Sequence, residues 1–247
     1  MSKPLTTFIF SYERPIYLWA TLDSLYRTTK SNIRFVIVDS GSRDPLVKKV
    51  IDGFSRRHMF DEVLLLDQND SEWFVPFFAE RLEEVGEFFF SLESDVIIAP
   101  EETCWTQRML GVMKSNRKLA MLGSMIDKSD FIDPDVLQAR LGRGLTTNER
   151  KSLKLESPER TMADIGPYDV ESPFNPPGRL LALRTDAVQT HLSKWEHSSD
   201  HQMHVILKNN GWETGIYGGV VHRHLSLCNY FDYPQYSMSE RDQYMKS

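Results

Sequence analysis

The sequence has few cysteines and no long hydrophobic run. Its 247 residues include only two cysteines, Cys104 and Cys228, which lack the spacing of a metal site or a disulfide framework. No apolar run approaches the ~18 residues of a membrane helix, and the amino-terminal apolar stretch is too short for a secretion signal. We therefore expect reduced thiols, no integral membrane segment and a cytoplasmic location.

Several common motifs are also missing. The chain has no GxxxxGK[ST] phosphate loop, no GxGxxG fingerprint and no HExxH helix, which argues against a P-loop kinase, a dehydrogenase and a zincin. The formal net charge is −6, so no overall positive field attracts nucleic acid or anionic lipid. Basic stretches at 55–58 and 114–118 could border a nucleic-acid groove, but such stretches are more typical of solvated helix ends.

Apolar runs alternate with segments of helical periodicity along most of the chain. The expected strands lie within residues 6–11, 33–45, 62–67, 88–100, 119–124, 179–184 and 213–224. This alternation predicts an α/β fold: a Rossmann-like three-layer α/β/α sandwich with a mostly parallel central sheet. The stretch from about 127 to 178 is rich in charge, Gly and Pro, and we expect a long loop or an insertion there.

Polar residues follow three of the expected strands. Tyr12, Asp39 and Asp95 each stand at a strand end, and ligands of open α/β sheets bind beyond the carboxyl ends of the strands. Glu93 and Asp95 also interrupt an otherwise apolar stretch, "FFFSLESDVIIAP", where two carboxylates need something to compensate their charge. The simpler alternative is that both acids end a strand at solvent.

Six stretches, taken in order, resemble the family 2 glycosyltransferases of the GT-A fold over about residues 5–226. They are "FIFSYERPIYLWATLDSL", "FVIVDSGSRD", "FFFSLESDV", "LLALRTDAV", "SSDHQMHVILKNNGWETG" and "GGVVHRHLS". The resemblance implies an inverting, metal-dependent transfer of a sugar from a nucleotide-sugar, with a UDP-sugar favoured, to a hydroxyl acceptor. The chain departs from the family in its Glu-Ser-Asp triplet, in Ser199 where an acid is usual, and in an insertion at 140–176.

The resemblance also assigns residues to a cation and to catalysis. Asp95 would bind Mn²⁺ or Mg²⁺, hard ions that suit a carboxylate and phosphate oxygens. Glu93 would contact the ribose or a metal-bound water. His222 would complete the metal shell, with His224 as a substitute, although a histidine at a strand end is more often structural. Asp200 would be the catalytic base, although acids are common in the first turn of any helix.

The donor nucleotide would lie against the first two strand ends. By resemblance, Asp39 would accept a hydrogen bond from the uracil imide, Tyr12 would stack on the base, and Arg14 would reach the base or a phosphate. Asp39 could instead cap the turn that follows it, and Tyr12 could pack at the rim of the core. The segment Arg184–Asp186 would shape the sugar and acceptor pocket.

We therefore expect one catalytic domain over 1–247. Its nucleotide-binding half would cover about 1–100, its acceptor half about 101–226, and its tail 227–247. A glycan is the favoured acceptor, with a nucleic acid or a small molecule left open, as is the oligomeric state. Two rivals remain: a nucleotidyltransferase that makes nucleotide sugars, and a nucleotide-sugar-binding protein with a decayed site.

Overall fold

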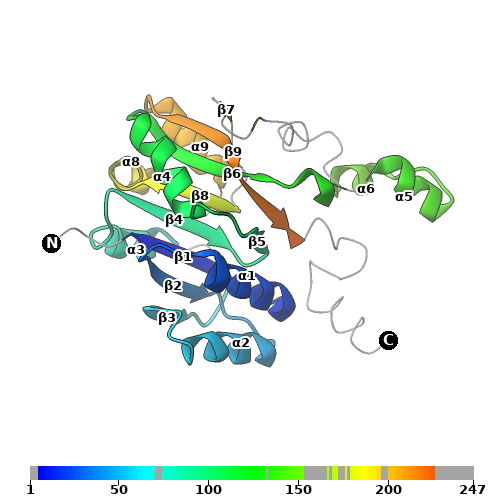
Figure 1. The fold of residues 1–247 in the computed structure, drawn as a ribbon, viewed down its shortest axis with the longest axis horizontal. Coiled ribbons are helices and arrows are strands. Elements are labelled where there is room, and N and C mark those ends of the chain that lie inside the picture. The colour runs from blue at the N-terminus through cyan, green and yellow to red at the C-terminus, as the bar shows by residue number, and fades with distance from the viewer. Residues whose placement is uncertain are drawn as a thin grey trace.

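The apolar runs of the sequence form one sheet in the computed structural model of the protein (Figure 1). The structure describes residues 5–69, 74–131, 133–152, 166, 169–171, 176, 179–195 and 200–225. The strands are β1 (Thr6–Ser11), β2 (Arg34–Asp39), β3 (Glu62–Leu65), β4 (Phe88–Glu93), β5 (Val96–Ile98), β6 (Leu119–Ile126), β7 (Val170–Glu171), β8 (Leu180–Arg184) and β9 (Glu213–His224).

The order of the strands across the sheet is β3-β2-β1-β4-β8-β6-β9-β5, with β7 paired to β9. Strands β1 to β4 run parallel, as do β6 and β9. Strand β8 runs antiparallel to both β4 and β6, and β5 and β7 run antiparallel to β9. In the described part of the chain, six of the nine strands thus point the same way, which confirms the mostly parallel sheet.

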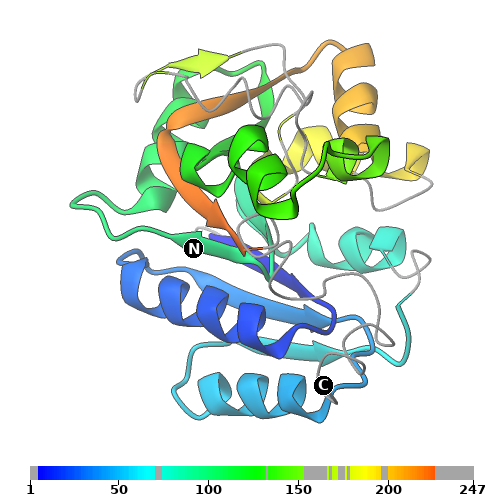
Figure 2. The same ribbon diagram turned by 90° about the vertical axis from the view of Figure 1, so that its right-hand side faces the viewer.

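Helices cover both faces of the sheet, as the sandwich requires. The α-helices of the described residues are α1 (Pro15–Thr28), α2 (Pro45–Ser55), α3 (Phe74–Arg81), α4 (Trp105–Ser115), α5 (Pro134–Leu141), α6 (Thr147–Ser152), α8 (Thr185–His191) and α9 (Asp200–Asn209). One apolar core joins the sheet to α1, α2 and α4, and a second joins its other face to α3, α8 and α9. Figure 2 shows α1 and α2 side by side on the first of these faces. Among the described residues, no helix is long and apolar enough to cross a membrane.

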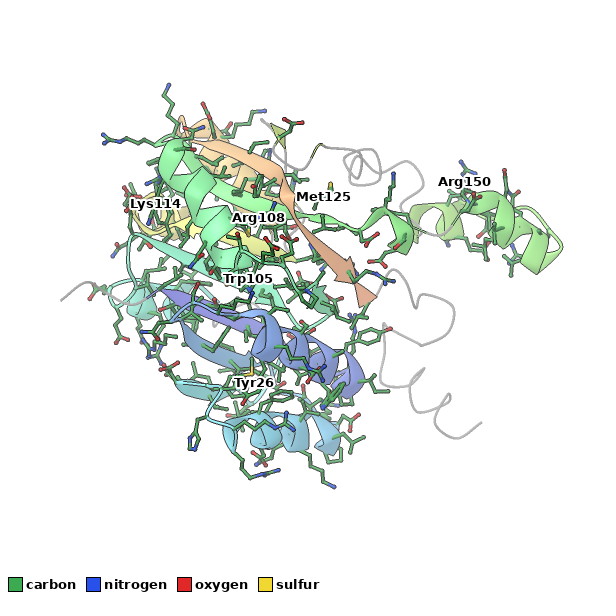
Figure 3. All side chains as sticks on the ribbon, viewed as in Figure 1. Tyr26, Trp105, Arg108, Lys114, Met125 and Arg150 are labelled. Atoms are coloured by element: carbon green, nitrogen blue, oxygen red, sulfur yellow. The ribbon has the colours of Figure 1, made fainter. Side chains whose placement is uncertain are left out.

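The expected loop over 127–178 is wrong for part of its length, because α5 and α6 lie within it. The side chain of Asp133 accepts a hydrogen bond from the first turn of α5, and Gly142, at φ 66°, ends that helix. Thr146 and Glu149 form a reciprocal capping box at the start of α6. In Figure 1 these helices project away from the sheet beyond the end of β6, and Figure 3 labels Arg150 on this arm.

An irregularity in β9 brings its end to the β4–β5 turn. Ser124 of β6 is opposite Tyr217, but the next residue, Met125 (labelled in Figure 3), is opposite Val221. The extra residues include Gly219, where a Cβ atom would lie 2.1 Å from the ring of Tyr217, so no larger residue fits. Beyond this bulge β9 pairs with β5, an arrangement that sets its last residues beside the acids of the β4–β5 turn.

Candidate active site

Asp95 lies at the centre of the expected site and is almost fully buried. It stands in the turn between β4 and β5, with 3% of its surface exposed. Its Oδ2 atom is 3.4 Å from the Arg14 guanidinium and 3.9 Å from Nδ1 of His224. A buried carboxylate needs positive charge nearby, and here the Arg14 guanidinium, just before α1, supplies it. Asp95 therefore does not simply end a strand at solvent.

The two ring nitrogens of His222 differ in their hydrogen bonding. The residue is 1% exposed, and its Nδ1 atom lies 2.7 Å from the hydroxyl oxygen of Ser124. Its Nε2 atom is buried and has no hydrogen-bond partner among the residues that the structure describes. Burial, assisted by the charge of His224 and opposed by that of Asp95, lowers the pKa of His222 to about 3. The imidazole is therefore neutral near pH 7.

Glu93 occupies the last position of β4, and its carboxylate forms an ion pair with Arg179. Burial raises the pKa of Glu93, Arg179 acts against this rise, and the negative charges of Asp95 and Asp200 add to it. The carboxylates of Asp95 and Asp200 thus both act electrostatically on that of Glu93. A cation bound among these carboxylates would offset the repulsion between their negative charges.

Asp200 is the first residue of α9 and is half-buried. Its Oδ1 atom accepts a hydrogen bond of 2.8 Å from the backbone N–H of His201. The negative charge of Asp200 acts to raise the pKa of both Glu93 and His204. The neighbouring Ser199 lies outside the described residues.

The loops after β1 and β2 are tied together by a residue that the sequence did not single out. Glu13, at φ 55°, is buried, and its carboxylate accepts hydrogen bonds from the backbone N–H groups of Arg43 and Asp44, at 2.7 and 3.1 Å. Its own N–H donates to the Ser42 hydroxyl at 2.7 Å. Neighbouring Arg14 also has a positive φ, of 56°, a conformation that non-glycine residues rarely adopt. The loop contacts hold this strained turn in place.

Asp39 and Tyr12 stand at the same rim. Asp39 is 5% exposed and accepts two hydrogen bonds from Ser42, one from the N–H at 2.9 Å and one from the hydroxyl at 2.7 Å. It therefore caps its turn, and each oxygen keeps a lone pair for another donor. Tyr12 is 42% exposed, so it is not buried in the core.

The segment Arg184–Asp186 lies far from these residues. In the ladder between β4 and β8, Arg184 is opposite Phe88, the first residue of β4, whereas Glu93 is the last. The Arg184 guanidinium donates to the carbonyl groups of Leu119 and Met113 and packs over the Phe88 ring. The expectation that this segment shapes the substrate pocket is therefore wrong for Arg184, whose role is structural.

The donor set partly suits a hard divalent cation. Across the described part of the chain, no three His, Cys, Asp or Glu side chains come close enough together to hold a metal ion. The buried Nε2 of His222 nevertheless needs a partner, and the carboxylate of Asp95 lies within electrostatic reach of this ring. Mg²⁺ and related ions often take one or two protein ligands and complete their shell with phosphate oxygens and water. The residues therefore fit a cation that is shared with a ligand.

A groove lies between two helices on one face of the sheet. It is a groove of about 620 Å³ between the outer surfaces of α1 and α2, and half-exposed Trp19 lines it. Arg56 and Arg57, from the basic stretch at 55–58, also line it, together with Lys49. This stretch thus begins at the last residue of α2 and borders a groove that apolar residues also line.

Comparisons with known proteins identify the fold. No protein-family model and no curated protein sequence matches the chain. A mannosyltransferase from Pyrobaculum calidifontis, solved with GDP-Man and Mn²⁺, matches at a TM-score of 0.55 and 13% identity over 91% of this chain and 57% of that one. GalNAc-T7, solved with UDP, GalNAc and Mn²⁺, matches at 0.57 and 11% identity over 90% and 44%.

The likeness to these two structures shows a GT-A-type fold, as the sequence predicted. This chain spans only about half the length of each of the two proteins.

Proposed function

We propose that the protein is a glycosyltransferase that moves a sugar from a nucleotide-sugar to a hydroxyl acceptor with the help of a divalent cation. The observation that carries this proposal is the buried carboxylate of Asp95 at the ends of the central strands, which acts electrostatically on both Glu93 and the buried ring of His222. Both structures of similar fold were solved with Mn²⁺, together with GDP-Man in one case and UDP and GalNAc in the other.

Asp95 and Nε2 of His222 would hold Mn²⁺ or Mg²⁺. Bound there, the cation would neutralise the negative charge that develops on the departing diphosphate. Arg14 lies 3.4 Å from Asp95, so its guanidinium would reach the same diphosphate rather than the base. Glu93, held by Arg179, would accept a hydrogen bond from the ribose or from a water at the cation.

Asp200 would be the general base. Its carboxylate stands at the start of α9 and would take the acceptor's hydroxyl proton. The acceptor oxygen would then form a bond to the anomeric carbon while the bond from that carbon to the diphosphate breaks, and the electron pair leaves with the diphosphate. A single displacement of this kind inverts the anomeric configuration.

The donor would be a UDP-sugar. Asp39 keeps carboxylate lone pairs that can accept the imide N–H of uracil, and the exposed ring of Tyr12 can stack on the base. One of the two similar structures carries GDP-Man and the other UDP, so the preference for uracil rests on Asp39 alone. A glycan is the acceptor we favour.

Release of UDP from UDP-sugars tests the proposal. We expect release that needs Mn²⁺ or Mg²⁺, rises with the right acceptor, and falls at least a hundredfold in Asp95→Asn. The matched control is Asp52→Asn, which removes an exposed carboxylate paired with Lys48 on α2 and should keep full activity. Tight nucleotide binding without turnover on any acceptor would favour a binding protein, and pyrophosphate release from UTP and a sugar phosphate would favour a nucleotidyltransferase.

A further inference from the structure

Ser124 is buried on β6 at the last position before the bulge in the β6–β9 ladder. Its hydroxyl oxygen lies 2.7 Å from Nδ1 of His222 and 3.5 Å from the carbonyl oxygen of Leu180. Ser124 thus joins the middle of the sheet to the strand end that reaches the candidate site. Nothing in the sequence around Ser124 indicated its contact with His222.

The two contacts of Ser124 favour one tautomer of the imidazole. A serine hydroxyl has a single proton, and the Leu180 carbonyl can only accept it. When the hydroxyl points to Leu180, its oxygen accepts the Nδ1–H of His222, and the Nε2 atom keeps a lone pair. In the other tautomer an N–H group at Nε2 would be buried with no acceptor among the described residues, which is costly.

We propose that Ser124 is a positioning residue that fixes the ring and the tautomer of His222, so that Nε2 presents its lone pair to the cation beside Asp95. The inference rests on the proposed function, because it assumes the cation. Histidine ligands of metals are usually held through their other ring nitrogen, and loss of such a partner weakens metal binding about 10- to 100-fold. Ser124 touches neither substrate nor metal in this scheme.

The contacts of the Nδ1 atom differ between His222 and His224. His224 turns its Nδ1 atom toward Asp95, at 3.9 Å, and its backbone N–H donates to Asp130. His222 turns its Nδ1 atom the other way, toward Ser124, and thereby keeps Nε2 for a ligand. Ser124 thus holds the ring of His222, whereas His224 faces Asp95 and is held through its backbone by Asp130.

The test compares Ser124→Ala with Thr214→Val. Thr214 makes the same kind of contact, a hydroxyl 2.6 Å from Nδ1 of His204, on the same strand as His222 but with a different histidine. The affinity for Mn²⁺ is measured by the electron paramagnetic resonance signal of free Mn²⁺, in the full chain with and without UDP. We expect Mn²⁺ to bind 10- to 100-fold more weakly to Ser124→Ala and equally well to Thr214→Val. If Ser124→Ala does not fold, Ser124→Cys, a poorer acceptor of similar size, should show a smaller loss in the same direction.

The tautomer is read separately, from ring ¹⁵N shifts of the metal-free protein, with His222→Asn used for assignment. A proton on Nδ1 in the natural protein supports the inference, and a proton on Nε2 overturns it. If the natural protein and Ser124→Ala bind Mn²⁺ equally well, the positioning role is refuted while the proposed function stands. If the natural protein binds no Mn²⁺ with any nucleotide, the cation of the proposed function fails, and the ring shifts still decide the tautomer.

Discussion

Acid should destabilise the protein through His222. The pKa of this side chain is about 3 in the folded protein, against an ordinary value of 6.5. The neutral ring is favoured by folding, so its contribution is fully present above pH 6.5 and is lost as the pH falls toward 3. Each pH unit in this window costs about 1.4 kcal/mol, so a drop to about pH 5 should cost roughly 2 kcal/mol.

Urea unfolding of the natural protein and of His222→Asn, at about pH 7.5 and pH 5 in EDTA, measures this cost. Asparagine can still donate to Ser124 but does not titrate in this range. Groups that do not interact with His222 titrate equally in both proteins, so the natural protein should lose about 2 kcal/mol more than the variant between the two pH values. An equal loss in both proteins would refute the reasoning, since it would mean that the folded protein can protonate His222 freely.

Three further substitutions have distinct expected results. Arg184→Leu leaves buried carbonyl groups without their donor and should lower the free energy of unfolding by about 3 kcal/mol, measured in urea, with no change in turnover at low temperature. Glu13→Ala removes the acceptor of two backbone N–H groups and should cost about 1–3 kcal/mol; calorimetry should also show weaker UDP binding, because the loops after β1 and β2 lose their connection. Asp95→Asn should abolish turnover while the melting temperature without metal stays the same or rises, since the variant no longer buries a charge.

The order and nature of most elements could be predicted from the sequence, because buried strands of an α/β sheet are short apolar runs. The four residues Phe35 to Val38 of β2 are all buried. An amphipathic helix would not bury four consecutive side chains, so such a run indicates a strand that is covered on both faces. The residues of a strand do not indicate whether it runs parallel or antiparallel to its neighbours. Strand β8 is as apolar as its neighbours, yet it runs antiparallel to β4, and this reversal carries Arg184 to the end of the sheet opposite Glu93.

The sequence around the helices α5 and α6 contains residues that are typical of helix caps. Asp133, Gly142, and the pair Thr146 and Glu149 are ordinary capping residues, but the charge and Gly content of the surrounding stretch outweighed them in the prediction. The contact between Ser124 and His222 could not have been predicted at all, because it joins residues 98 positions apart and depends on the bulge in β9.

The measurement that tests the central claim most directly is a thermal shift with UDP, GDP, dTDP and CDP, each with and without Mn²⁺. A ligand at a hundredfold excess over its dissociation constant stabilises the folded state by about 2.7 kcal/mol, roughly 5–10 °C for a chain of this size. The account predicts such a rise for UDP, only when Mn²⁺ is present, and its loss in Asp95→Asn. An unchanged melting temperature with every nucleotide and metal would contradict a nucleotide-diphosphate site built around Asp95 and His222.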